Sequence, residues 1–129
     1  MGKTKRLSKA TVANDAAENL VAAIITGIQE KKGHSIVVMN IGSTGSAIAD
    51  YFVICDGNSG TQVAAIAESV EEEVRKLTGE TPSYREGYTN AEWILLDYIN
   101  VVVHIFQKEQ REFYGIERFW ADAETRRVE

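Results

Sequence analysis

The feature that most constrains the fold is a strand, a turn and a helix in direct succession over residues 50–79. The run DYFVIC at 50–55 has the β-branched and aromatic content of a strand. An Asp-Gly turn follows, and Ser59 with Gln62 forms a capping box that opens a helix. Apolar residues then recur at +3, +4, +7, +11 and +14 from Val63, on one face of that helix. A helix of this length between strands favours a parallel β-α-β unit.

Other segments complete a mixed α/β pattern. Apolar periodicity predicts a helix over 11–31 and a last helix over 108–120. The β-type runs predict further strands over 35–41, 83–86, 93–98 and 101–106. About eight residues join the 35–41 strand to the next one, too few for a helical crossover, so these two strands should pair antiparallel. The predicted fold class is therefore α/β, with a mixed sheet of about five strands flanked by three helices.

One domain accounts for the chain, because 129 residues suffice to bury a self-sufficient core. We expect a flexible basic arm over residues 1–13, a single domain over 14–123 and a polar tail over 124–129, with fraying from residue 121 onward. No apolar run is long enough for a membrane span, and no secretory signal opens the sequence. Cys55 is the only cysteine, which excludes an intramolecular disulfide and fits a reducing, cytoplasmic location.

The net charge of −5 limits the classes of partner that the chain is expected to bind. It disfavours long-range attraction to nucleic acid, so we expect no direct DNA binding. A basic protein partner suits this charge better.

An acidic residue flanks each end of the 50–55 run. Gly42-Ser43 followed by Asp50 resembles the arrangement in nucleotidyltransferases, where a Gly-Ser turn precedes a strand with two carboxylates two residues apart. That spacing puts both carboxylates on one strand face, where they share a divalent metal. Here Phe52 occupies the second position, and Asp56 lies roughly 20 Å from Asp50 along an extended strand. The metal site is incomplete, so we expect no metal and no catalytic residue.

Two further chemical motifs are weak. The loop over 42–46 lacks the lysine and the helix of a P-loop and is expected to be a flexible connector. Cys55, His104 and Asp97 are the ingredients of a nucleophilic triad, but all three lie in apolar β runs without an exposed elbow. His104 is instead expected to be a hydrogen-bonded histidine at the surface or the core edge.

The β runs at 93–98 and 101–106 predict a hairpin with large apolar residues on both faces. Such a sheet needs helices on both sides, or a partner on one. Cover from within the chain is the default, and a protein interface is the alternative, because aromatic residues beside acids suit interfaces. The turn at Ile99-Asn100 is unusual, since isoleucine tolerates a positive φ poorly.

Several ordered blocks, at 50–55, 57–59, 86–87, 93–97, 101–106, 113–114 and 120–122, resemble the ribosomal silencing factor family (RsfS, also called Iojap). The resemblance covers nearly the whole chain from about residue 14 to 123, and the blocks agree in spacing. The sequence departs from the family at Ile99, where glycine is expected, and at Gly115 in the last helix.

The resemblance implies a nucleotidyltransferase-like fold without established transferase activity, and hence a protein that is not an enzyme and needs no cofactor. It implies binding to the large ribosomal subunit through ribosomal protein L-fourteen. The bound factor would block association with the small subunit and so repress translation. This partner is basic, in agreement with the charge of −5.

The expected interface combines aromatic and aliphatic anchors with carboxylates that pair with Lys or Arg on the partner. Face alternation and the family blocks together indicate the residues. The expected partner-binding residues are Glu86, Tyr88, Trp93, Leu95, Asp97, His104, Phe106 and Tyr114.

Two alternatives stay open at this point. One is a metal-dependent nucleotidyltransferase that uses Asp50. The other is a self-associating structural module whose apolar sheet face is buried in a homodimer. A homodimer and a ribosomal partner can coexist if they compete for one surface.

Overall fold

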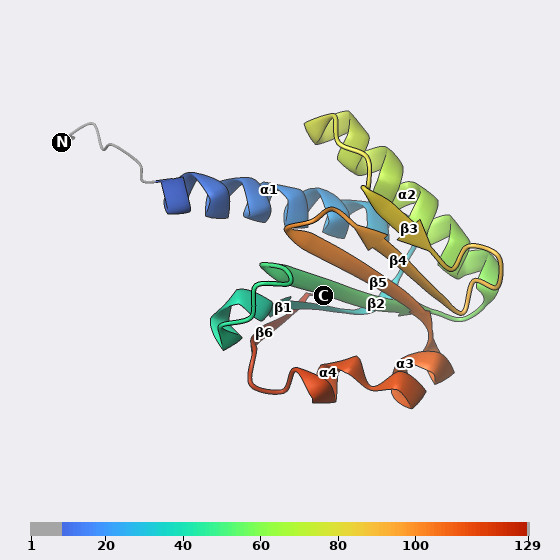
Figure 1. The fold of residues 1–129 in the computed structure, drawn as a ribbon. Coiled ribbons are helices and arrows are strands. Elements are labelled where there is room, and N and C mark those ends of the chain that lie inside the picture. Colours follow the sequence, from blue (N-terminus) through green and yellow to red (C-terminus); the bar gives the residue numbers. More distant parts are fainter. Residues whose placement is uncertain (1–8, 129) are drawn as a thin grey trace.

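The computed structural model describes residues 9–128, which form one mixed sheet with helices on both faces (Figure 1). The strand order across the sheet is β3-β4-β5-β2-β1-β6. Along the chain the elements are α1 (Lys9–Glu30), β1 (His34–Asn40), the 3-10 helix η1 (Ile41–Thr44), β2 (Tyr51–Gly57), α2 (Gly60–Thr78), β3 (Tyr84–Glu86), β4 (Trp93–Asp97), β5 (Val101–Gln107), α3 (Lys108–Tyr114), α4 (Ile116–Phe119) and β6 (Glu124–Val128).

The long helices α1 and α2 lie on the same face of the sheet and form the main core with it (Figure 1). The two helices approach closely at Gly27, where a Cβ atom would come within 2.7 Å of the Val70 Cα. The Ser69 hydroxyl donates a hydrogen bond to the Gly27 carbonyl at 2.8 Å. The apolar face predicted for α2 is buried here from Val63 to Val74, whereas its last predicted member, Leu77 in the final turn, is exposed.

The opposite face of the sheet is covered by the short helices α3 and α4 (Figure 1). A second and smaller core lies there, built from β1, β2 and β5 side chains with Ala123. Ile116 and Trp120 pack on it, as do Trp93 and Leu95 from β4. Since α3 and α4 have seven and four residues, they cover less of the sheet than α1 and α2 do.

The predicted antiparallel pairing of β1 with β2 is confirmed. The strand that pairs in parallel with β2 is β5, which follows α2, β3 and β4 along the chain, whereas β3, the first strand after α2, pairs with β4. Half of the predicted capping box is present: the Gln62 backbone N–H donates to the Ser59 hydroxyl at 3.2 Å. The Gln62 side chain accepts from the Asn58 N–H at 2.8 Å, one residue before the N-cap. The mixed α/β class follows, while the nucleotidyltransferase-like label stays a prediction.

The sheet has six strands rather than about five, because the predicted frayed tail contains β6. This strand pairs antiparallel with β1, with Val38 opposite Arg126. Its sequence, ETRRV, carries no apolar alternation, and its first four residues are exposed. Backbone pairing at the free edge of β1 stabilises it, and charged side chains are common on such edge strands.

Three other expectations need correction. The last helix is divided at Gly115, which adopts a left-handed conformation with φ 58° and caps α3. The loop at 42–46 is not a loose connector: the Asn40 side chain caps η1 at 3.1 Å, and the Ser43 hydroxyl accepts from the Glu124 N–H at 3.1 Å. Of the predicted arm, residues 1–8 lie outside the described residues, and residues 9–13 belong to α1.

Among the helices of residues 9–128, none has the length and apolar content needed to cross a membrane.

Candidate partner-binding face

The hairpin of β4 and β5 places six side chains on the face of the sheet under α3 and α4, called the half-covered face below. Register pairs Trp93 with Phe106, and Leu95 with His104. Asp97 faces Val102 at the end of β4. The alternation read from the sequence is therefore correct, and the neighbours Ile94, Leu96 and Tyr98 are buried on the other face, in the core beneath α1 and α2.

Trp93 is the centre of an aromatic group on this face. Its ring stacks on Phe106 with centroids 4.8 Å apart and meets Tyr114 of α3 at 4.8 Å. Its indole N–H donates to the Nδ1 atom of His104 at 3.1 Å. Phe52 of β2 lies 4.6 Å from the His104 ring and continues the group toward α4. These contacts fix the orientation of the Trp93 ring although part of the ring meets solvent.

His104 is buried and neutral. Burial lowers the pKa of His104 to about 3, because desolvation disfavours the charged imidazolium. Because Nδ1 accepts from Trp93, the proton of the neutral ring is on Nε2. That N–H has no hydrogen-bond partner among the described residues. The expectation of a hydrogen-bonded histidine at the core edge holds for one of its two nitrogens.

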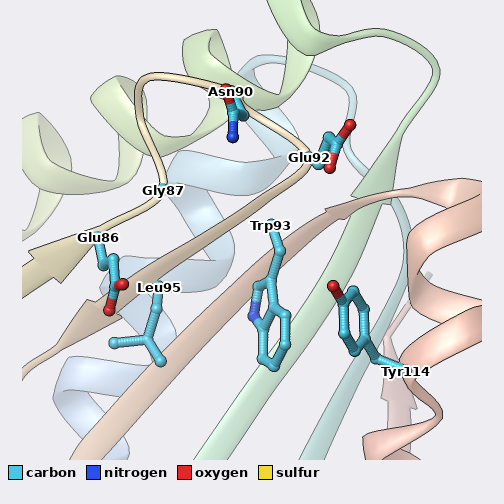
Figure 2. A pocket seen from close by; sticks show the side chains of 7 residues that line it. All are labelled: Glu86, Gly87, Asn90, Glu92, Trp93, Leu95 and Tyr114. Atoms are coloured by element: carbon cyan, nitrogen blue, oxygen red, sulfur yellow. The ribbon is translucent and has the colours of Figure 1, made fainter.

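A pocket of about 290 Å³ opens beside Trp93, between the loop that joins β3 to β4 and helix α3 (Figure 2). Its walls combine two carboxylates, an amide, two aromatic rings and an aliphatic side chain. The lining residues are Glu86, Gly87, Asn90, Glu92, Trp93, Leu95 and Tyr114.

The expected interface residues divide into three groups. Glu86, Trp93, Leu95 and Tyr114 line the pocket together. His104 and Phe106 lie beneath it and are buried, so they support the surface rather than form it. Asp97 lies at the far end of β4, where its carboxylate accepts a 2.7 Å hydrogen bond from the Ile99 backbone N–H and orders the turn.

Tyr88 does not belong to this face. Its hydroxyl donates to Glu71 of α2 at 2.6 Å, and its ring packs against the core under α1 and α2. Burial and this hydrogen bond raise the pKa of Tyr88 above its usual range. The sequence analysis grouped Tyr88 with the other expected partner-binding residues, but the turn after Gly87 sends its side chain to the other side of the sheet.

The pocket also contains residues that the sequence analysis missed, chiefly Glu92 and Asn90. Both lie in the turn before β4, where no periodic pattern assigns a face. The turn is tight: Gly87 has φ 98°, and a Cβ there would collide with the Trp93 carbonyl oxygen. Glycine is required at this position. The Ala91 N–H donates to the Gly87 carbonyl at 2.8 Å and closes the turn.

Arg111 anchors α3 and α4 to the sheet. One of its Nη1 hydrogen bonds reaches the Asp56 carboxylate at 2.8 Å and another the Ser35 carbonyl at 2.8 Å. Its Nε and Nη2 donate to the two carboxylate oxygens of Glu117, at 2.9 and 3.0 Å. Asp56, expected in a turn, is thus a buried residue of β2. No local pattern pairs residues so far apart in sequence.

The charges in this cluster stabilise one another. Burial alone lowers the pKa of Arg111, but hydrogen bonds to Glu117 and Asp56 outweigh burial and raise it. The hydrogen bonds from Arg111 lower the pKa of Glu117. A buried arginine with both carboxylates satisfied is a structural link rather than a free binding group.

The catalytic alternatives receive no support from the geometry. The sheet separates Cys55 from His104, because Cys55 is buried under α1 and α2 while His104 lies on the other face. Burial also raises the pKa of the Cys55 thiol well above its usual range. Within residues 9–128 we find no group of three or more His, Cys, Asp or Glu side chains arranged to hold a metal ion.

The comparisons with known sequences point to the same family. Residues 14–129 match the family model described as ribosomal silencing factor during starvation. A protein of Halalkalibacterium halodurans named ribosomal silencing factor RsfS is 38% identical over 112 residues, which are 87% of this chain and 94% of that one.

Two solved structures have a similar fold. One from Bacillus halodurans has a TM-score of 0.70 and 35% identity, and the match covers 87% of this chain and 98% of the other. One from Chromobacterium violaceum has a TM-score of 0.76 and 27% identity, over 81% and 85% of the two chains.

Proposed function

Because this chain belongs to the ribosomal silencing factor family, we propose that it binds the large ribosomal subunit through ribosomal protein L-fourteen and prevents the small subunit from joining. Family membership supports the ribosome as partner and translation as the regulated process. The block is steric: it requires attachment at the face of the large subunit that meets the small one. No bond is made or broken, and no cofactor takes part.

The observation that carries the proposal is the set of aromatic side chains that stays exposed at the pocket end of the half-covered face. Trp93 and Tyr114 are held in place by ring contacts, yet 51% of Tyr114 is exposed and Trp93 is half-buried. Trp and Tyr contribute most of the binding energy in many interfaces when a partner desolvates them. Phe113 and Phe119 on the same pair of helices are 76% and 78% exposed and extend the apolar surface.

The charge of this region supports a basic partner. Glu86 and Glu92 flank the aromatic rings, and Asp97 lies further along β4. Opposite charge on the partner would steer association and fix the orientation of the complex. A surface of about 800 Å² per partner is enough for stable attachment, and the hairpin with α3 and α4 would supply it.

Co-sedimentation with purified large ribosomal subunits tests the proposal. The wild-type protein should pellet with the subunits, and Trp93→Ala and Asp97→Lys should pellet less. Glu72→Lys, on the exposed surface of α2, has the same charge change as Asp97→Lys on the opposite side of the molecule and should pellet normally. Circular dichroism of each variant separates lost binding from lost folding.

Light scattering then tests the steric block. Addition of the wild-type protein to large subunits before small subunits should lower the amount of whole ribosomes formed, and Trp93→Ala should restore it. If the wild-type protein stays in the supernatant, the proposal fails. If Trp93→Ala and Asp97→Lys both pellet normally, binding occurs elsewhere on the molecule.

The exposed Phe113 and Phe119 also favour a second candidate, a homodimer through the same face. Sedimentation velocity over a range of concentrations would detect it. If the dimer uses this face, large subunits should dissociate it.

A further inference from the structure

We propose that the pocket beside Trp93 receives a single arginine side chain from the protein partner. The inference rests on the proposed function for the partner's identity, but its chemistry comes from the pocket alone. The guanidinium would lie between the carboxylates of Glu86 and Glu92, and its aliphatic stem would contact Leu95 and the edges of the aromatic rings (Figure 2).

The first support is the negative charge of the two pocket carboxylates, which no basic side chain that lines the pocket offsets. Two carboxylates line the pocket, and no basic side chain does. Glu92 is exposed and makes no ion pair with any residue of the part of the chain that the structure describes. Glu86 accepts one hydrogen bond, from the Tyr84 hydroxyl at 2.8 Å, and this bond orients it without neutralising it.

Other hollows on the described surface differ in this respect. In the hollow between α2 and β3, Arg85 pairs with Glu71 at 3.0 Å. In the hollow beside α3, Arg111 pairs with Glu117 at 2.9 Å. The chain therefore supplies arginines to acids in both places, and leaves the pocket beside Trp93 for a cation from outside.

The second support is the aromatic wall. A cation near an indole or phenol ring is attracted by the ring quadrupole, and arginine also stacks its planar group on such rings. Trp93 and Tyr114 meet at 4.8 Å, so the cation would lie against the pair rather than between the rings. Glu86 and Glu92, which lie in different directions from Trp93 in Figure 2, would accept the guanidinium N–H groups.

The size and rigidity of the pocket restrict the kinds of molecule that can occupy it. A pocket of about 290 Å³ lies at the small end of ligand sites and suits one side chain rather than a nucleotide or a cofactor. The turn at Gly87 and the stacking of Trp93 on Phe106 fix the walls in advance. A preorganised site loses less conformational freedom on binding. A planar fork of donors fits two separated carboxylates better than a point-like ammonium, which favours arginine over lysine.

Titration with a minimal probe tests the pocket without any ribosome. The isotope-labelled full-length protein is titrated with N-acetyl-L-arginine amide, and the indole N–H signal of Trp93 is followed by NMR. We expect a saturable shift of this signal and of the Gly87 amide, with a weaker response to the lysine analogue and none to the norleucine analogue. An equal response to norleucine, or no saturable response to arginine, would overturn the inference.

Isosteric variants link the pocket to the partner. Glu92→Gln and Glu86→Gln remove charge from exposed positions and should leave the fold unchanged, while each weakens the arginine probe and large-subunit binding by about tenfold. Glu72→Gln on α2 has the same charge change and should affect neither measurement.

The two failures are distinguishable. If the wild-type protein does not bind large subunits but the arginine titration succeeds, the proposed function fails and the pocket stands. If Trp93→Ala abolishes subunit binding while both pocket variants bind normally, the face is correct and the arginine inference is wrong.

Discussion

The two faces of the sheet differ in how completely the chain covers them. One face lies under α1 and α2, two long helices that pack at Gly27 and enclose Ile66, Val70 and the inner side of the hairpin. The other face lies under α3 and α4, short helices that leave Trp93 and Leu95 half-buried. The chain covers the first face with its own helices, whereas on the second face apolar area and carboxylates stay exposed, as the proposed partner site requires.

This difference between the two faces indicates which one contributes most to folding stability and which one is proposed to bind a partner. Large enclosed side chains on the α1–α2 face contribute to the free energy of folding. On the other face, a charged cluster at Arg111 secures the helices at one end, and the open pocket lies at the other end. Substitutions can therefore separate the two contributions, and the following predictions are arranged by the size of the expected effect.

Loss of the Arg111 cluster should have the largest effect. Arg111→Met leaves the buried Asp56 without its arginine, with only the His34 imidazole at 3.8 Å, which should cost about 3–5 kcal/mol of unfolding free energy. Urea unfolding measures it. The double variant Arg111→Met with Asp56→Leu removes the buried pair, leaves only the more exposed Glu117 carboxylate, and should recover much of the loss. If the single variant is as stable as wild type, the half-covered face does not depend on this link.

A matched pair of truncations compares the faces directly. Ile66→Ala empties a fully enclosed site and should cost about 2–5 kcal/mol. Leu95→Ala removes a half-buried side chain and should cost about 1 kcal/mol, while it weakens large-subunit binding. Equal destabilisation by the two variants would contradict the division between a stability face and a binding face.

The pH dependence of stability should reveal His104. The folded state holds this histidine neutral with a pKa of about 3, below the usual 6.5, so the unfolded state binds the proton more readily. Stability should therefore be fully present above pH 6.5 and fall by up to about 1.4 kcal/mol per pH unit as pH decreases toward 3. Carboxylates also titrate in this range, so the measurement is the difference in slope between wild type and His104→Gln. Identical slopes would mean that His104 is solvated.

The smallest effect concerns the hairpin turn. Ile99 has φ 76° and is 66% exposed, so it carries left-handed strain without burial in return. Ile99→Gly should raise the unfolding free energy by up to about 1 kcal/mol, reduced by the greater freedom of glycine in the unfolded chain. Thermal unfolding measures this. Ile48→Gly, at an exposed residue with an ordinary φ, is the control and should not stabilise.

The sequence predicted the parts of the fold that depend on local pattern. The periodicity from Val63 located α2, and alternation assigned Trp93, Leu95 and Asp97 to one face. It failed where pairing partners lie far away in the chain. β6 has no apolar signal of its own and exists because β1 offers a free edge.

The sequence predicted some residues of the candidate site and missed others, for the same reason. Glu86, Trp93, Leu95 and Tyr114 were expected and lie together in the pocket. Glu92 was missed because a turn has no periodic face, and Tyr88 was misplaced because the same turn reverses its direction. The nucleotidyltransferase alternative depended on Asp50. Asp56 was expected only in a turn, and its role became clear with its long-range partner Arg111.

The parallel pairing of β2 with β5 has a consequence for the order of folding. The hairpin of β4 and β5 and the pair of β1 and β2 join residues that are near neighbours in sequence, as in Asp97 with Val102 and Asn40 with Tyr51. The pairing of β2 with β5 joins Tyr51 to Val101, so a long loop that includes α2 must close first. Local pairs form fast and distant ones slowly. The pairs β1–β2 and β4–β5 should thus form quickly and meet at the slow β2–β5 seam, while β6 joins β1 in a second distant pairing. Substitutions at Val53 or Val103, which pair across that seam, should alter the folding rate more than substitutions elsewhere in the two fast pairs.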